Sequence, residues 1–336
     1  MTSRVPATLA LRPWRSFTAI VILLAFLFGL VARRYIHRYS LTLPTVLGVY
    51  SCFIVQLSLA LAPAFLRPRN EEVRCFARAP YSFRQIALWC LPYMLYAAGT
   101  GDWRSASLAR LLAVAVPVLG IYTFFPLKAL SRFTLQDAAV ALLLIIAVLS
   151  HVLARIWNIP VNLDFIARLY LLTVACWCWT TVRPVPTLGY SFTLTARVFR
   201  AATWNFLCFA VIALPTGFVL GFTAWHPRWR GAGTFFTDFL EIFLFIALLE
   251  ETFFRGFLQS LLSASLNSWW KAQAIVSCLF GLFHILHAPF PNWRYVLLAT
   301  AAGWFYGSAF RNGGSLLASS LTHALVDTVW RTFLTR

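Results

Sequence analysis

Charge of either sign is scarce in this chain, and acidic residues are the scarcest. Only 11% of its 336 residues are charged, against about 25% in a typical soluble domain. Hydrophobic residues make up 60% and the mean hydropathy is +0.76, a composition that excludes an ordinary soluble fold. The 28 Lys and Arg residues outnumber the 10 Asp and Glu, and they stand singly or in short groups between apolar runs. This distribution is typical of loops that face lipid headgroups and argues against nucleic-acid binding.

Several sequence signatures are also missing. The seven cysteines lie mostly within apolar runs, and Cys176-Trp177-Cys178 lacks the spacing of a metal knuckle or a redox motif. The absence of a His-Glu-x-x-His motif excludes a zincin. The apolar runs are continuous rather than alternating, so membrane β-strands are not expected. Because soluble folds and membrane β-strands are excluded, the sequence predicts a helical membrane protein.

Long hydrophobic runs are what the sequence has in abundance. A membrane-spanning helix needs about 20 mostly apolar residues. We therefore predict an all-α, polytopic bundle of about 10–11 transmembrane helices, with an uncleaved first helix and a short interfacial helix at 193–202. The predicted spans are 17–32, 43–66, 86–100, 107–127, 137–154, 165–182, 203–223, 235–249 running on past 258, 271–287, 295–311 and 314–334.

The ten acidic residues divide the chain into two parts. The five that precede residue 230, among them Asp137, are expected in loops or at span ends, where a charge is solvated. The other five lie within or at the ends of apolar segments: Asp238, Glu241, Glu250, Glu251 and Asp327. We therefore predict an N-terminal transmembrane region of unknown role over residues 1–200 and a functional domain over residues 201–336.

Glu250, Glu251 and Arg255 place three charges within six residues of an apolar run. Each charge at membrane depth costs at least about 2.5 kcal/mol, so such residues usually have a function. Residues four apart share a helical face, so Glu251 and Arg255 are expected to pair. Glu250 projects about 100° away from that pair, and a desolvated carboxylate is a stronger base that suits general-base catalysis. A structural ion-pair cluster at the membrane interface is the alternative.

Two later helices add imidazoles and another acid. His284 and His287 are three residues apart, and His323 and Asp327 are four apart and can contact each other. Ser319 extends the His323 stripe, but it is not in a nucleophile elbow, so we do not expect a serine nucleophile. A lone interfacial histidine such as His284 is often only a hydrogen-bonded side chain.

If these helices converge, a carboxylate, two imidazoles and a second acid can activate a water and stabilise an oxyanion. Two histidines and a carboxylate could also bind zinc, although we do not favour a metal. Asp238 and Glu241 lie near the start of their helix, where acids favour the helix dipole, and are left out of the site.

Three motifs on successive helices carry a resemblance to a known family. Glu250-Glu251-x-x-x-Arg255-Gly256, Phe280-x-x-x-His284 and His323-x-x-x-Asp327 resemble the motifs of the CPBP (Abi) family. This family comprises CAAX prenyl endopeptidases and bacteriocin-processing relatives, which are glutamic-type intramembrane proteases. The resemblance covers roughly residues 205–336 and leaves the first two hundred residues unmatched.

The resemblance implies roles for the motif residues. Glu250 would activate the hydrolytic water and His284 would help to hold it, while His323 and Asp327 would occupy the oxyanion-hole positions. The supporting pair would be Glu251 and Arg255.

Prenyl endopeptidases usually have Asn at the position of Asp327, and an Asn amide donates to an oxyanion whereas an ionised Asp repels it. Asp327 is therefore either protonated or orients His323. The acid at this position and the unmatched N-terminal spans indicate a bacterial protein. They favour a multi-pass protein of the cell membrane, which in a bacterium is the inner membrane.

The sequence thus predicts an intramembrane endopeptidase that uses a Glu-activated water without a cofactor. Its partners would be the lipid bilayer and a peptide or protein substrate in or at the membrane, lipidated or not, and no nucleic acid. The alternatives are a proton-coupled transporter or a non-catalytic membrane scaffold that uses the same ionisable groups. Transporters usually show repeated halves with broken helices, and the sequence shows neither.

Overall fold

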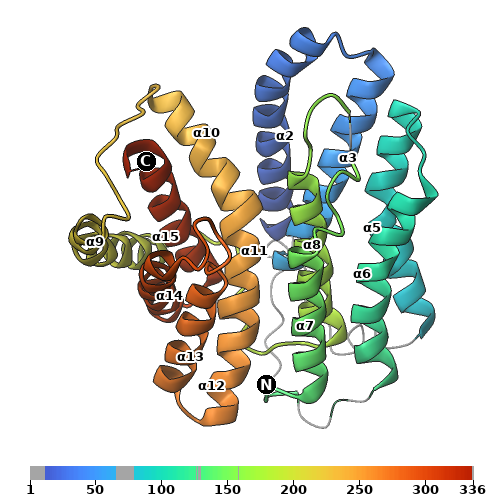
Figure 1. Cartoon of the computed structure of the whole chain (residues 1–336). Helices are drawn as coiled ribbons and strands as arrows, with labels where there is room; N and C mark the ends of the chain where they lie inside the picture. The colour runs from blue at the N-terminus through green and yellow to red at the C-terminus, as the bar shows by residue number, and fades with distance from the viewer. Residues whose placement is uncertain (1–11, 66–78, 126, 128–129, 158, 335–336) are drawn as a thin grey trace. The chain divides into compact units, whose positions relative to one another are not determined.

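A computed structural model describes residues 12–65, 79–125, 127, 130–157 and 159–334. Every regular element in these residues is a helix, which confirms the all-α prediction (Figure 1). The chain forms two compact units. The N-terminal unit comprises Met1–Leu127 and Leu135–Arg183, and the C-terminal unit comprises Lys128–Thr134 and Pro184–Arg336.

The N-terminal unit is a bundle of helices that pack through small residues. Helices α3 (Leu43–Leu61) and α5 (Ala79–Thr100) lie very close where Gly48 faces Gly99, since a Cβ on Gly99 would lie 2.4 Å from the Cα of Gly48. The elements are α2 (Arg12–Tyr39), α3 (Leu43–Leu61), η1 (Ala62–Ala64), α5 (Ala79–Thr100), α6 (Ser105–Phe124), α7 (Leu135–Leu149), α8 (Phe165–Trp177) and η2 (Cys178–Val182).

Asp137 in the first turn of α7 corrects one prediction. We expected a solvated carboxylate, but its side chain is fully buried and forms an ion pair with Arg183. Nε and Nη2 of Arg183 donate to the two carboxylate oxygens at 2.8 and 2.9 Å, and the Tyr122 hydroxyl donates to Oδ1 at 2.9 Å. The prediction was wrong because the partner lies 46 residues away, beyond any local pattern.

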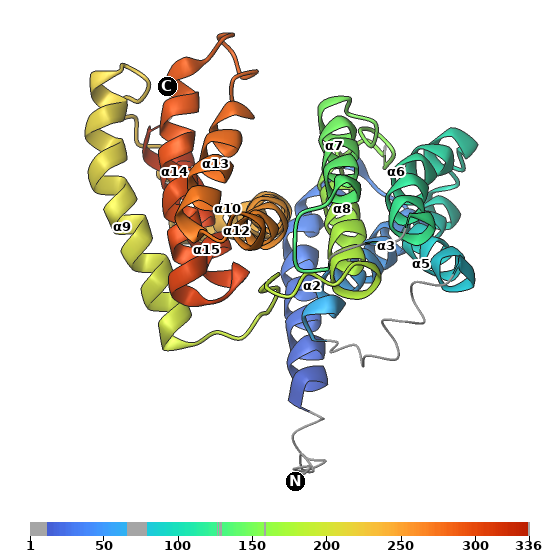
Figure 2. The same ribbon diagram turned by 90° about the horizontal axis from the view of Figure 1, so that it is seen from below.

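The C-terminal unit contains the motif residues. Its elements are α9 (Ala196–Val219), α10 (Ala232–Ile242), η3 (Phe243–Ala247), α11 (Leu248–Glu251), η4 (Thr252–Gln259), α12 (Ser260–Leu266), α13 (Trp269–Leu282), α14 (Trp293–Gly313), α15 (Leu316–Val329) and η5 (Trp330–Leu334). Elements α10 to α12 form one continuous helix over Ala232–Leu266. Helix α14 packs against α9, α13 and α15, and α15 also contacts α11 (Figure 2). The three motif-bearing segments therefore meet in this unit.

Helix α9 differs from the predicted interfacial helix at 193–202 followed by a separate span. It is unbroken from Ala196 to Val219. Its start is fixed by Thr195, whose side chain accepts a hydrogen bond from the backbone N–H of Val198. Residues 196–202, which we assigned to the membrane surface, are therefore continuous with the predicted span.

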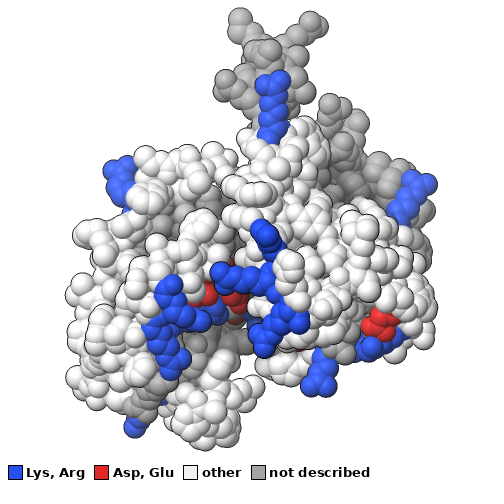
Figure 3. Space-filling view, turned by 90° about the horizontal axis from the view of Figure 1, so that it is seen from above, with Lys and Arg blue, Asp and Glu red and all other residues white. Residues whose placement is uncertain are grey.

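Six helices of the described chain are long and apolar enough to cross a membrane: Trp14–Tyr39, Leu43–Ala64, Ser105–Phe124, Phe165–Val182, Ala196–Val219 and Ala232–Leu266. The other predicted spans correspond to α5, α7, α13, α14 and α15, which fall short in length or hydropathy. Large apolar side chains are exposed along the long helices, such as Phe26, Val211 and Trp204. Lys and Arg clearly outnumber acidic residues on the face in Figure 3. The chain is a multi-pass membrane protein.

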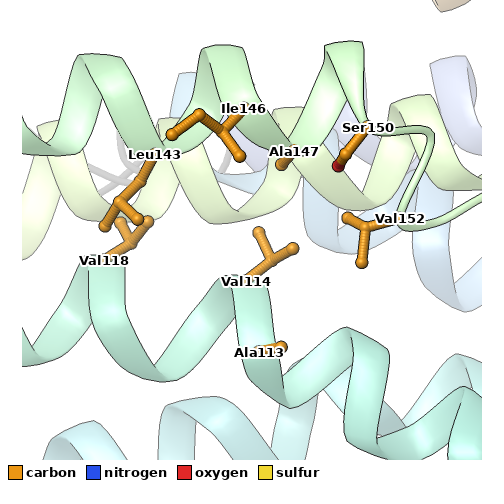
Figure 4. Close-up of a pocket in the computed structure, with 8 residues that line it drawn as sticks. All are labelled: Ala113, Val114, Val118, Leu143, Ile146, Ala147, Ser150 and Val152. Atoms are coloured by element: carbon orange, nitrogen blue, oxygen red, sulfur yellow. The ribbon is translucent and has the colours of Figure 1, made fainter.

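A cavity of about 130 Å³ opens between α6 and α7 in the N-terminal unit (Figure 4). Its walls are apolar, with side chains such as Val114, Val118, Leu143 and Ile146, and Ser150 supplies a hydroxyl. None of the described residues that line it has a titratable side chain, so these residues supply none of the groups that acid–base catalysis needs.

Candidate active site

The continuous helix Ala232–Leu266 changes its winding around the two glutamates. Glu250 and Glu251 lie on α11, a four-residue α-helical stretch between the π-helical segments η3 and η4. Such π-helical turns are rare and frequently occur at functional sites. Arg255 follows on η4, so the motif of two glutamates and one arginine lies where the helix is locally irregular.

Glu251 is the centre of a buried hydrogen-bond network. Its side chain has no exposed surface, and its Oε1 accepts from Nη1 of Arg255 and from Nδ1 of His323, each at 2.9 Å. The hydroxyl of Ser319 donates to Oε2. The predicted pairing of Glu251 with Arg255 is therefore present. A buried ion pair is tolerated when additional hydrogen bonds satisfy its remaining oxygens, as they do at Glu251.

Arg255 is held on its other sides by α13 and α14. Its Nη2 donates to the backbone carbonyl of Gly303 at 2.9 Å, and its guanidinium lies 4.6 Å from the ring centre of Phe280 and 5.3 Å from that of Tyr306. Aromatic faces attract a desolvated cation. A Cβ on Gly303 would lie 3.2 Å from Nη2, so the glycine allows this close approach.

His323 on α15 connects Glu251 with Asp327. The imidazole is buried, and because a carboxylate only accepts hydrogen bonds, its Nδ1 donates to Glu251. Its Nε2 lies 3.4 Å from Oδ2 of Asp327, whose side chain is 39% exposed. Tyr306 stacks on the ring at 4.6 Å with an interplanar angle of 14°. The network therefore leads from a buried glutamate to an acid that solvent or substrate can reach.

Ser319 lies in the stripe with His323 and Asp327, but it does not bond to the imidazole. Its hydroxyl donates to Glu251 instead. A serine nucleophile needs a neighbouring base to take its proton, and in a serine triad that base is a histidine. The arrangement makes Ser319 a support for Glu251 and agrees with the expectation that it is not a nucleophile.

His284 lies just beyond the end of α13. Its Nδ1 is 2.9 Å from the carbonyl oxygen of Phe280, so Nδ1 donates and Nε2 is the acceptor of the neutral ring. The ring of Phe280 lies 5.0 Å from that of His284 and 5.8 Å from that of His323. His284 is also within electrostatic range of His323 and Asp327. The two motif histidines thus flank one aromatic ring.

Glu250 is half-buried beside Glu251. It lies within electrostatic range of Arg255 and of Tyr295, and Tyr295 is also within range of Asp327. The ring of Tyr295 is 4.5 Å from that of His284. His284 therefore contacts Tyr295, and Glu250 and Asp327 lie within electrostatic range of the same tyrosine.

Sequence reasoning missed the aromatic and hydroxyl groups that support these ionisable residues. Tyr295 and Tyr306 carry no signal that separates them from other aromatic residues of an apolar helix. Ser319 was identified in the stripe with His323, but its bond to Glu251 was not predicted, because the two residues are 68 apart in the sequence. The exclusion of Asp238 and Glu241 agrees with their contacts, since they lie 3.6 and 3.3 Å from Nη1 of Arg331.

A metal site does not form from the described side chains, since no three His, Cys, Asp or Glu residues gather closely enough to hold an ion. The motif histidines instead bond to a carboxylate and to a backbone carbonyl. The expectation of a cofactor-free reaction stays a prediction.

A comparison with known families gives a match to the C-terminal unit. Residues 232–329 match the family described as type II CAAX prenyl endopeptidase Rce1-like. The match covers α10 to α15 and all three motifs, and it confirms the resemblance that the motifs indicated. No curated protein and no solved structure matches the chain.

Proposed function

With residues 232–329 placed in a family of CAAX prenyl endopeptidases, we propose that the protein is an intramembrane endopeptidase. In this proposal it hydrolyses a peptide bond of a membrane-associated substrate with a water that Glu250 activates. The observation that carries the proposal is the buried contact between Glu251 and His323, which fixes an imidazole against the residue that follows Glu250. The family match also favours hydrolysis over proton-coupled transport.

The chemistry follows from the donors and acceptors present. Glu250 removes a proton from water, and the resulting hydroxide attacks the peptide carbonyl carbon. His284, with Nδ1 bonded to a carbonyl, has Nε2 as an acceptor that can help to orient the water. The protonated Glu250 then transfers its proton to the leaving amine as the C–N bond breaks, so the reaction yields an acid and an amine.

The oxyanion of the tetrahedral intermediate needs a hydrogen-bond donor, and removing one such donor typically slows a reaction by about 10²–10³-fold. His323 is the group that we assign to this role. Glu251 accepts from its Nδ1 and so stabilises the imidazolium form, in which Nε2 can donate. Asp327, 3.4 Å from Nε2, orients the same ring from its exposed side.

The test is the substitution Glu250→Gln, which preserves the shape of the side chain and removes its basicity. We expect the hydrolysis rate to fall by at least about 10³-fold, within the range of a general-base contribution. The measurement uses internally quenched peptides in detergent micelles or liposomes, one with a prenylated Cys-aliphatic-aliphatic-X end and one with an unmodified apolar sequence. The difference between the two peptides also defines the substrate class.

Glu241→Gln is the matched control, because Glu241 belongs to the same continuous helix but is 55% exposed and paired with Arg331. It should cleave at the wild-type rate. Full activity of Glu250→Gln would contradict the proposed role of Glu250.

A further inference from the structure

Next to Arg255, segments η4, α13 and α14 bring small and polar residues together in two layers. Each helix contributes two residues that are four apart in the sequence: Arg255 and Gln259 of η4, Gln273 and Ser277 of α13, and Gly303 and Gly307 of α14. In the first layer, a Cβ on Gly303 would lie 3.1 Å from the Cα of Ser277 and 3.2 Å from Nη2 of Arg255.

In the second layer, a Cβ on Gly307 would lie 2.9 Å from Oε1 of Gln259 and 3.1 Å from Cγ of Gln273. The glycines therefore let polar side chains lie against the backbone of α14.

The polar atoms of these layers are unevenly satisfied. Gln273 has a full set of partners, since Nε2 donates to the Trp304 carbonyl and to Ser308, and Oε1 accepts from Nε1 of Trp269. Gln259 has no exposed surface, and neither atom of its amide has a hydrogen-bond partner among the described residues.

The same holds for the hydroxyl of Ser277, which is 3% exposed, and for Nε of the fully buried Arg255. Together these groups offer two donors on Gln259 and one on Arg255, with an acceptor on Gln259 and a hydroxyl that can do both. Buried polar groups in proteins almost always find a partner, and a bound water is the usual one where no side chain serves.

We propose that this junction is a water-binding site, in which ordered water bridges Gln259, Ser277 and Nε of Arg255. The site lies next to the ion pair that holds Glu251. It continues through Gln273 to Ser308 and to Trp269, both of which are partly exposed. Bound water would join these polar residues into a path from the partly exposed Ser308 and Trp269 towards Arg255 and Glu251.

The role of this path rests on the proposed function, because each peptide hydrolysis consumes one water. A site within an apolar bundle must obtain that water from a polar route, since hydrocarbon holds almost none. When a substrate covers the exposed side at Asp327, the junction is a route that stays open. The junction would hold water one helical turn behind the Glu251–Arg255 pair and resupply the reaction. Water binding itself is independent of whether the protein is a peptidase.

The first measurement is a structure of the full chain at a resolution that shows ordered water. We expect density within hydrogen-bond distance of Gln259, Ser277 and Nε of Arg255, and its loss in Gln259→Met. Gly307→Ala is a second variant, because its methyl group would lie 2.9 Å from Oε1 of Gln259 and close the space. A Gln259 amide that instead bonds directly to a backbone carbonyl would overturn the site.

The second measurement is the kinetics of Gln259→Met and Ser277→Ala on the quenched peptides. We expect kcat to fall about tenfold, the effect of one lost hydrogen bond, while KM is unchanged because both side chains are buried. Gln56→Met is the matched control, since Gln56 of α3 is equally buried and also has an unpartnered Oε1, but lies in the N-terminal unit. Its kcat should not change.

If Gln259→Met lost the ordered water but kept the wild-type kcat, the proposed role of the junction in supplying water to the reaction would be overturned. If the wild-type protein cleaves neither peptide, the proposed function fails, and the density alone decides the water site.

Discussion

The two units each bury an arginine–carboxylate pair, and the pairs are built differently. In the N-terminal unit, Nε and Nη2 of Arg183 donate to separate oxygens of Asp137 at 2.8 and 2.9 Å. In the C-terminal unit, Arg255 reaches Glu251 through Nη1 alone at 2.9 Å. All four side chains have no exposed surface. Burial therefore does not distinguish the two pairs, and their hydrogen-bond partners do.

The difference indicates which pair supports chemistry. Two parallel bonds between a guanidinium and a carboxylate fix both groups in one geometry, which suits a structural contact. Glu251 instead divides its oxygens among Arg255, Ser319 and His323. Through His323 it is connected to Asp327, which is partly exposed. A buried charge that orients a titratable group near the surface is the arrangement expected of an active site.

The largest effect is expected for Glu251→Gln. The amide would leave Arg255 as an uncompensated buried charge, at a cost of about 3–5 kcal/mol of stability. It would also remove the acceptor that stabilises the charged form of His323, which we expect to lower hydrolysis by on the order of 10³–10⁴-fold per folded molecule. Thermal unfolding in detergent and the rate on the quenched peptides measure the two effects. If Glu251→Gln hydrolysed the peptides at nearly the wild-type rate, the Glu251–Arg255 pair would be as dispensable for catalysis as the Asp137–Arg183 pair is expected to be.

Asp137→Asn makes the same chemical change in the N-terminal unit. Arg183 would lose its charge partner, and the expected cost is again about 3–5 kcal/mol of stability. The hydrolysis rate per folded molecule should be unchanged, because Asp137 and Arg183 belong to the N-terminal unit and the motif residues to the C-terminal unit. A reduced rate in the folded fraction would show that the N-terminal unit takes part in catalysis.

The same two pairs show how far sequence reasoning reaches. Glu251 and Arg255 are four residues apart on one helix, so their contact follows from helical periodicity alone. Helix starts were also accessible, since Ser268, Asn292 and Ser315 are residue types that cap helices and their side chains accept from the first turns of α13, α14 and α15.

Contacts set by tertiary packing were not accessible. Asp137 and Arg183 are 46 residues apart, and Ser319 and Glu251 are 68 apart, so their pairing depends on which helices pack together. The π-helical turns around α11 have no recognised sequence signature either. The contacts within single helices, Glu251 with Arg255 and His323 with Asp327, were predicted, but the bonds between helices that complete the network were not.

Ser319→Ala tests that network at one bond. The variant removes a hydrogen bond to a buried carboxylate, which contributes about 1.5–3 kcal/mol, and we expect hydrolysis to fall about tenfold or somewhat more. Ser320→Ala is the matched control, because its buried hydroxyl has no partner among the described residues and its removal should cost little. A different result would support the hypothesis of a serine nucleophile. In that case Ser319→Ala, but not Ser320→Ala, would lose all activity, and the wild-type protein would form a covalent adduct on Ser319.

The smallest effect is expected for Asp327→Asn, at the exposed end of the network. The contact with His323 is long at 3.4 Å, and 39% of the Asp327 side chain is exposed, so solvent screens the pair and its loss costs at most about 1 kcal/mol. An Asn amide can still orient the imidazole and can also donate to an oxyanion. Hydrolysis should therefore stay within about fivefold of the wild-type rate. A loss of several hundredfold, measured as kcat/KM, would instead show that the charge of Asp327 is required and would make the exposed end of the network as important as its buried end.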